Sequence, residues 1–83
     1  VHILSVGRFH RDKGQRYSLL ALRRLRRTGR LVHWTFVGVG PDRERLVRFA
    51  ERIGVASSVS ILTAVAPDEL RRLYARSHIF VLA

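Results

Sequence analysis

Apolar residues follow two alternating patterns along the chain, and this alternation indicates the fold class. Short, nearly unbroken apolar runs occur at residues 1–6, 31–37, 58–62 and 79–83. Between them, apolar and charged positions recur with the spacing of a helix. Strands that are covered by helices on both faces carry few polar residues, so the runs predict buried parallel strands. The pattern therefore predicts an α/β protein.

Three helices are expected between these strands, at about residues 14–28, 41–53 and 67–76. At 100° per residue, the first helix has an apolar stripe that we expect to pack on the sheet, made of Tyr17, Ala21, Leu22 and Leu25. Arginines are expected on its opposite side, and Leu19 falls among them. The third helix is expected to bury Leu70, Leu73 and Tyr74.

Four strands that alternate with three helices, β-α-β-α-β-α-β, predict a Rossmann-like parallel sheet with right-handed crossovers. The expected strand order is 3-2-1-4. That order leaves residues 79–83 as an apolar edge strand, which natural sheets avoid. We therefore expect a further strand after Ala83, in a longer protein. Ligands of such sheets bind beyond the carboxyl ends of the strands, between the first and fourth strands.

The turn from Gly7 to Gly14 is the strongest candidate for a binding element. It follows the first predicted strand and precedes the first helix. Glycine permits a positive φ and a close approach of a ligand, and a helix N-terminus attracts anions. Arg8, Arg11 and Lys13 make the turn basic. The sequence therefore predicts a phosphate-binding turn, although no Ser or Thr follows the lysine as in a Walker A loop, and the Gly-x-Gly-x-x-Gly dinucleotide signature is absent.

Composition excludes a few kinds of site and segment but does not indicate one class of protein. The chain has 83 residues, a net charge of +10 and no cysteine, which excludes disulfides and thiolate metal sites and fits a cytoplasmic location. No apolar run approaches the roughly 20 residues that span a bilayer. The charge favours an anionic partner or a solvated, arginine-rich surface, and the sequence leaves both interpretations open.

No catalytic or metal-binding constellation is apparent. The four histidines lack the spacing of metal ligands and are expected to be packing or surface residues; they are His2, His10, His33 and His78. His10 lies in the basic turn, where it could also touch a ligand. Neither a Ser-His-Asp set nor a pair of catalytic carboxylates can be assigned. We therefore predict no catalytic residue and no metal site within the chain.

Several short motifs in register resemble the C-terminal domain of group 1 glycosyltransferases of the GT-B fold. They are Ser5-Val6-Gly7-Arg8, Lys13-Gly14, Phe36-Val37-Gly38-Val39-Gly40-Pro41, Val65-Ala66-Pro67-Asp68-Glu69-Leu70, Leu73-Tyr74-Ala75-Arg76-Ser77 and Phe80-Val81-Leu82. The resemblance covers essentially the whole chain. It implies a hexosyltransferase that transfers a sugar from a nucleotide-diphosphate-sugar donor to an acceptor, with no metal or other cofactor.

The resemblance also implies roles for individual residues. The donor diphosphate would be bound by Gly7, Arg8, Lys13 and Gly14. The nucleotide pocket would be lined by Gly38, Gly40, Thr63 and Val65. The family usually has a glycine where this chain has Thr63, so the chain departs from the family pattern at this position.

By the same resemblance, residues 1–83 form a partial donor-binding domain, an incomplete half of a GT-B fold. Two glutamates that contact the donor in the family lie beyond this segment, and an acceptor-binding domain precedes it. The isolated chain is therefore expected to be inactive. Its expected partners are a nucleotide sugar, a sugar or lipid-linked acceptor bound by the preceding domain, and an anionic membrane at its inner face. Nucleic acid is not an expected partner.

Two interpretations without catalysis remain open: a small basic nucleic-acid-binding module and an inert α/β module. A nucleic-acid module needs exposed aromatic platforms or a helix that reads a groove. Trp34 instead lies in a predicted buried strand. Titration with a nucleoside diphosphate and with an oligonucleotide separates these interpretations from the donor-site prediction.

Overall fold

The computed structural model of the chain describes residues 1–9, 13–63 and 65–82. Strands and helices alternate as the sequence predicts. The elements are β1 (His2–Val6), α1 (Lys13–Arg27), β2 (His33–Val37), α2 (Arg43–Arg52), the 3-10 helix η1 (Ala56–Ser58), β3 (Val59–Leu62), α3 (Pro67–Arg76) and β4 (Ile79–Leu82). The end of the predicted last strand, Ala83, lies outside the described residues.

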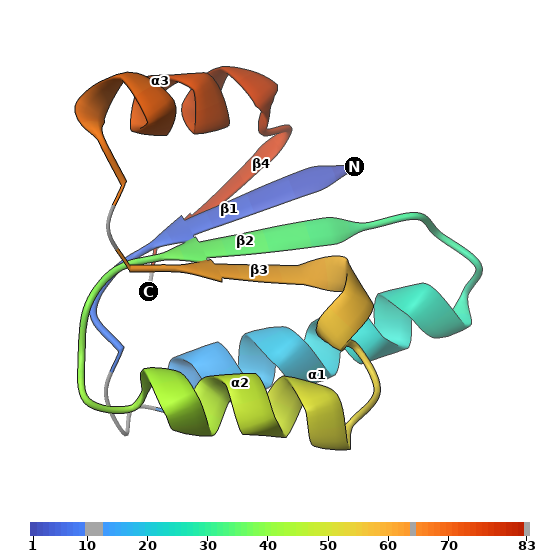
Figure 1. The fold of residues 1–83 in the computed structure, drawn as a ribbon. Helices are drawn as coiled ribbons and strands as arrows, with labels where there is room; N and C mark the ends of the chain where they lie inside the picture. Colours follow the sequence, from blue (N-terminus) through green and yellow to red (C-terminus); the bar gives the residue numbers. More distant parts are fainter. Residues whose placement is uncertain (10–12, 64, 83) are drawn as a thin grey trace.

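The strands form one parallel sheet in the order β3-β2-β1-β4, which confirms the predicted topology. Figure 1 shows α1 and α2 side by side on one face of the sheet and α3 on the other. β1 pairs with both β2 and β4, so it lies inside the sheet, while β4 is an edge strand. Ile79 and Phe80 of this edge are exposed, as expected for an uncovered apolar strand.

Most of the core lies between the sheet and the α1–α2 layer. Its buried members are Ile3, Phe9, Leu19, Leu22, Val32, Trp34, Phe36, Leu46, Ala50 and Val55. A smaller cluster on the α3 face contains Leu4, Val37 and Leu73. Each large apolar side chain that is fully buried stabilises the fold by about 1.5–3 kcal/mol. The α1–α2 face therefore contributes most to stability.

The buried face of α1 differs from the predicted stripe. Leu19 and Leu22 are fully buried, whereas Tyr17 is 63% exposed. The predicted stripe assumed that α1 packs on the sheet alone, but α1 also contacts α2. The guanidinium of Arg16 lies 5.3 Å from the ring centroid of Phe49 in α2. The face around Leu19 is thus turned toward the core, and arginines beside it border the second helix.

Two smaller expectations about the helices were also wrong. α2 begins at Arg43, because Pro41 and Asp42 form a turn before it. In α3, Leu73 is buried as predicted, but Tyr74 is 45% exposed. The ring of Tyr74 stacks on Phe80 of β4 with 4.9 Å between centroids. Tyr74 therefore contacts the edge strand instead of the centre of the sheet.

Three histidines meet at the amino ends of the strands. The rings of His2 and His33 are 5.3 Å apart, and the backbone N–H of His2 donates to Nδ1 of His78 at 2.9 Å. His33 Nε2 and Ser60 Oγ are hydrogen-bonded at 2.8 Å. These contacts connect neighbouring strands, in agreement with the predicted packing role. His10 lies outside the described residues.

This histidine cluster predicts a loss of stability in mild acid. Burial, followed by the neighbouring His33, lowers the pKa of His2 below its usual 6.5. The unfolded chain then binds more protons than the folded one, so stability is lost as the pH falls through the window below 6.5. We expect urea unfolding to show lower stability at about pH 5 than at about pH 7.5, with a smaller difference in His2→Gln. An identical difference in the variant would contradict this assignment.

Candidate functional site

The loops that follow β1 and β2 lie against each other at the carboxyl edge of the sheet. The backbone N–H of Gly7 donates to the carbonyl of Val37 at 2.9 Å, and that of Phe9 donates to the carbonyl of Val39 at 3.0 Å. Parallel pairing therefore continues past the ends of the two strands. Figure 1 shows the chain after each strand curving at this edge toward the N-termini of α1 and α2. The predicted phosphate-binding turn begins on this paired segment.

Gly38 and Gly40 are required by the close packing of these two loops. A Cβ added at Gly38 would overlap the carbonyl oxygen of Gly7, and one added at Gly40 would overlap that of Phe9. Both glycines thus have a structural explanation that needs no ligand. Their predicted role in a nucleotide pocket stays a prediction.

Arg8 is exposed at this edge, and a side chain of α1 holds its backbone in place. The side-chain amide of Gln15 in α1 donates from Nε2 to the carbonyl of Arg8 at 3.1 Å. Gln15 is only 6% exposed. Sequence reasoning missed this residue, because Leu19, on the same face of α1, was expected among the arginines on the exposed side.

The rest of the basic turn is described only in part. Gly14 lies in the first turn of α1, and its carbonyl accepts a hydrogen bond from Ser18 Oγ at 3.1 Å. Neither Gly7 nor Gly14 has the positive φ that the sequence suggested, since among the described residues only Gly29 and Gly54 do. Lys13 begins α1, but its side chain lies outside the described part of the structure.

Gln15 gives a direct test of how the turn is positioned. Leucine at this position would leave the Arg8 carbonyl without its partner while keeping a similar volume. We expect Gln15→Leu to lower the free energy of unfolding by about 1–2 kcal/mol, because a hydrogen bond from a buried amide is lost. Chemical denaturation measures this difference. Ser18→Ala, which removes the exposed hydrogen bond to Gly14, is the matched control and is expected to have a smaller effect.

The structure brings Thr63 to the same edge, while Val65 packs inward. Thr63 is exposed directly after β3, and the carbonyl of the preceding Leu62 accepts a hydrogen bond from the N–H of Gly38 at 3.0 Å. Val65 is partly buried and packs against the small cluster on the α3 face. The edge therefore presents, from β3 across to β1, an exposed threonine, two closely packed glycine loops and an exposed arginine.

This arrangement suits the binding of an anion. The exposed guanidinium of Arg8 lies on a loop whose backbone is fixed by hydrogen bonds, and the α1 N-terminus follows closely. Arginine side chains and helix N-termini both favour phosphate. Within the described residues, no group of three or more His, Asp or Glu side chains is placed to hold a metal ion.

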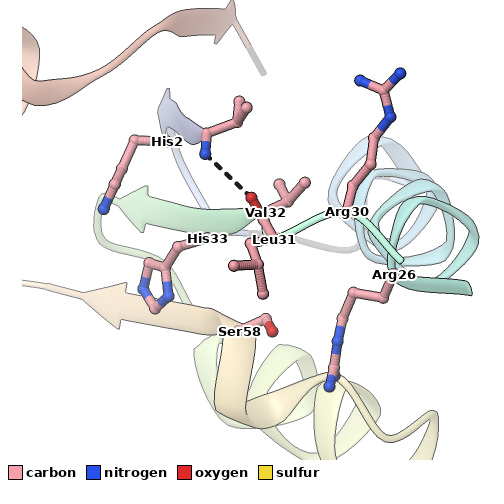
Figure 2. A pocket seen from close by; sticks show the side chains of 8 residues that line it. His2, Arg26, Arg30, Leu31, Val32, His33 and Ser58 are labelled. Atoms are coloured by element: carbon pink, nitrogen blue, oxygen red, sulfur yellow. Dashed lines mark hydrogen bonds between the residues drawn. The ribbon is translucent and has the colours of Figure 1, made fainter. Parts of the chain in front are cut away.

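A separate hollow of about 350 Å³ lies at the opposite, amino edge of the sheet. Figure 2 shows its lining, in which Arg26, from the last turn of α1, and Arg30, from the loop after it, extend in opposite directions. Nη1 of Arg26 donates to the carbonyl of Gly54 at 2.9 Å, so this arginine ties α1 to the end of α2. Ligands of parallel α/β sheets bind at the carboxyl edge. We therefore assign a structural role to this hollow.

The helices that the structure describes are all too short or too polar to cross a bilayer.

The sheet order and the helix layers define a Rossmann-like domain of the GT-B type. The chain belongs to the group 1 glycosyltransferase family, because the family model described as "Glycosyl transferases group 1" matches residues 1–83. Comparison with curated proteins finds no match.

A solved structure with a similar fold is the catalytic domain of cholesterol-alpha-glucosyltransferase from Helicobacter pylori. The TM-score is 0.73 at 17% sequence identity, over 95% of this chain and 47% of that one. At this identity the likeness establishes the fold alone. The chain spans about half the length of that structure.

Proposed function

We propose that residues 1–83 are the diphosphate-binding part of the donor site of a glycosyltransferase. The observation that carries the proposal is the placement of Arg8. Its side chain is exposed at the carboxyl edge of the sheet, and its backbone is fixed by Gln15 in a chain of the group 1 glycosyltransferase family. The donor is a nucleotide-diphosphate sugar.

The proposed chemistry rests on charge stabilisation. When the sugar leaves its donor, negative charge develops on the diphosphate leaving group. Arg8, Lys13 and the N–H groups of the α1 N-terminus, which includes Gly14, would stabilise this charge where it forms. Arginine binds phosphate oxygens with its planar fork, whereas lysine acts as a point charge. In this proposal the protein's own cations compensate the charge, and neither a metal ion nor another cofactor takes part.

The nucleotide would lie across the neighbouring strand ends. Gly38 and Gly40 would line its pocket with their backbone groups, since the carbonyl groups of Gly7 and Phe9 occupy their side-chain positions. Thr63 and Val65 would lie near the base. The complete active site would also need residues outside 1–83, so we propose that this chain alone does not transfer sugar.

A hexose donor and a sugar or lipid-linked acceptor complete the proposal. The similar Helicobacter pylori structure is named a cholesterol-alpha-glucosyltransferase, which supports a hexosyl group and a lipidic acceptor. Such an acceptor would be reached at the inner face of a membrane, and the net charge of +10 supports peripheral attachment to an anionic surface from the cytoplasm.

Titration with nucleotides tests the proposal. We expect saturable binding of nucleoside diphosphates, about tenfold tighter than binding of the matching monophosphates, because the second phosphate adds a charge-assisted hydrogen bond. Absence of diphosphate binding would contradict the proposal. Sugar transfer by the 83-residue chain would contradict its incomplete site.

Nucleic-acid binding is the competing function, supported mainly by the net charge. The one tryptophan of the chain is not available to stack on a base, because Trp34 is 5% exposed and stacks on Phe36 inside the core. Tight oligonucleotide binding that falls steeply with salt, without diphosphate binding, would favour it.

A further inference from the structure

Four arginines line a pocket between α1 and α2, on the side of these helices away from the sheet. The pocket has a volume of about 230 Å³, and its lining consists of Arg16, Arg45, Arg48, Arg52 and Phe49. Arg16 comes from the first turn of α1, and the other four residues come from α2. None of the described residues that line the pocket is acidic. The pocket is therefore a concentration of positive charge with an aromatic wall.

The spacing on α2 explains why these side chains converge. Arg45, Arg48 and Arg52 follow one another at intervals of three and four residues, so they share one face of the helix. That face meets α1 where the guanidinium of Arg16 lies over the ring of Phe49, 5.3 Å from its centroid. Stacking on an aromatic ring restricts the orientation of a guanidinium. At least one cation of the pocket is thus held in place before any ligand arrives.

Among the residues that the structure describes, these charges have little compensation. The carboxylate of Asp42 lies 3.8 Å from Nε of Arg45, a long and partly exposed ion pair. Among the described residues, no acidic side chain lies within ion-pair distance of Arg16, Arg48 or Arg52. Like charges in a shared hollow repel one another. A bound anion would relieve that repulsion.

We propose that this pocket binds a phosphate group with at least two negative charges, such as a phosphomonoester or a pyrophosphate. Several guanidinium groups that converge on one hollow match the tetrahedral array of phosphate oxygens, and each can donate two parallel hydrogen bonds. The site is distinct from the proposed donor site, because the lining of the pocket shares no residue with that site. The proposal therefore does not depend on the proposed function.

Residue-resolved NMR of the arginine side chains separates the two sites. Inorganic pyrophosphate would be titrated into isotope-labelled protein while the Nε–Hε signals of all arginines are followed. We expect saturable shifts at the pocket arginines and none at Arg24 and Arg27, exposed arginines of α1 outside the pocket. Uniform shifts at all arginines, or shifts at Arg8 alone, would overturn the proposal. The second result would still support the donor site.

A matched pair of variants tests the same point by affinity. Arg48→Gln/Arg52→Gln and Arg24→Gln/Arg27→Gln remove equal charge, from the pocket and from outside it. Binding at the pocket is followed through the Nε–Hε shifts of Arg16 and Arg45, which both variants keep. We expect the first variant to weaken pyrophosphate binding at this site by about tenfold or more and the second by less than about twofold. Circular dichroism confirms that both remain folded. Equal weakening in the two variants would show a non-specific charge effect and overturn the proposal.

Lipid vesicles identify the source of the phosphate. Sedimentation would compare vesicles of phosphatidylcholine with vesicles that also contain phosphatidic acid, whose headgroup is a phosphomonoester. Binding to phosphatidic acid that is lost in Arg48→Gln/Arg52→Gln, but kept in the control variant, assigns a lipid headgroup to the pocket. Pyrophosphate binding without vesicle binding assigns a soluble phosphate compound. Failure to bind either probe would overturn the proposal.

Discussion

Alanine in place of Gly38 is expected to unfold a large part of the protein population. The added Cβ would overlap the carbonyl oxygen of Gly7, which belongs to a rigid backbone segment and not to a flexible side chain. The loop after β1 would have to move, and its hydrogen bonds to Val37 and Val39 would be lost with it. We expect a loss of about 4 kcal/mol in the free energy of unfolding. A domain of this size has roughly 4–12 kcal/mol in total.

Gly29→Ala is the control for this substitution. Gly29 has a φ of 83°, and a Cβ there would meet no atom within 4 Å. Its cost is the strain of a left-handed alanine alone, about 1–2 kcal/mol. Urea denaturation followed by circular dichroism measures both variants. If Gly38→Ala proves no more destabilising than Gly29→Ala, the loops do not pack as closely as the structure shows.

The architecture could be predicted because its determinants are local. Apolar runs separated by helical periodicity define the order of the elements, and right-handed crossovers then restrict the order of the strands. The orientation of α1 could not be predicted in the same way. Tyr17 and Leu19 are both apolar enough to face the sheet, and the choice between them depends on where α2 lies. Phe49 of α2, far away in the sequence, packs against the core cluster that contains Leu19.

The residues of the candidate site also fall into those that have a local sequence signal and those that depend on distant contacts. Arg8 and the glycines could be selected from the sequence, because basic and glycine-rich turns after strands have a known chemistry. The reason for Gly38 is a contact with Gly7 across two strands, and the reason for Gln15 is a carbonyl seven residues earlier. Neither contact has a local signature. The convergence of Arg16 with the arginines of α2 likewise depends on packing between two helices.

Removal of the Arg8 side chain is expected to weaken nucleoside diphosphate binding by about 10–100-fold. This corresponds to the loss of one or two charge-assisted hydrogen bonds to phosphate, each about 1.5–3 kcal/mol, offset in part by water. The fold should be unaffected, because Arg8 is exposed and its structural contact is made by its backbone carbonyl, which alanine retains. Calorimetric titration of Arg8→Ala measures the affinity, and thermal unfolding checks the fold.

Arg72→Ala removes an equally charged, exposed side chain from α3 and is expected to bind diphosphate as the unmodified protein does. Arg8→Lys should fall between the two, because a lysine keeps the charge and loses the fork. This ranking distinguishes a bidentate contact from general attraction to a chain of net charge +10. If Arg8→Ala and Arg72→Ala weaken binding equally, the net charge accounts for the affinity, and Arg8 does not bind the diphosphate.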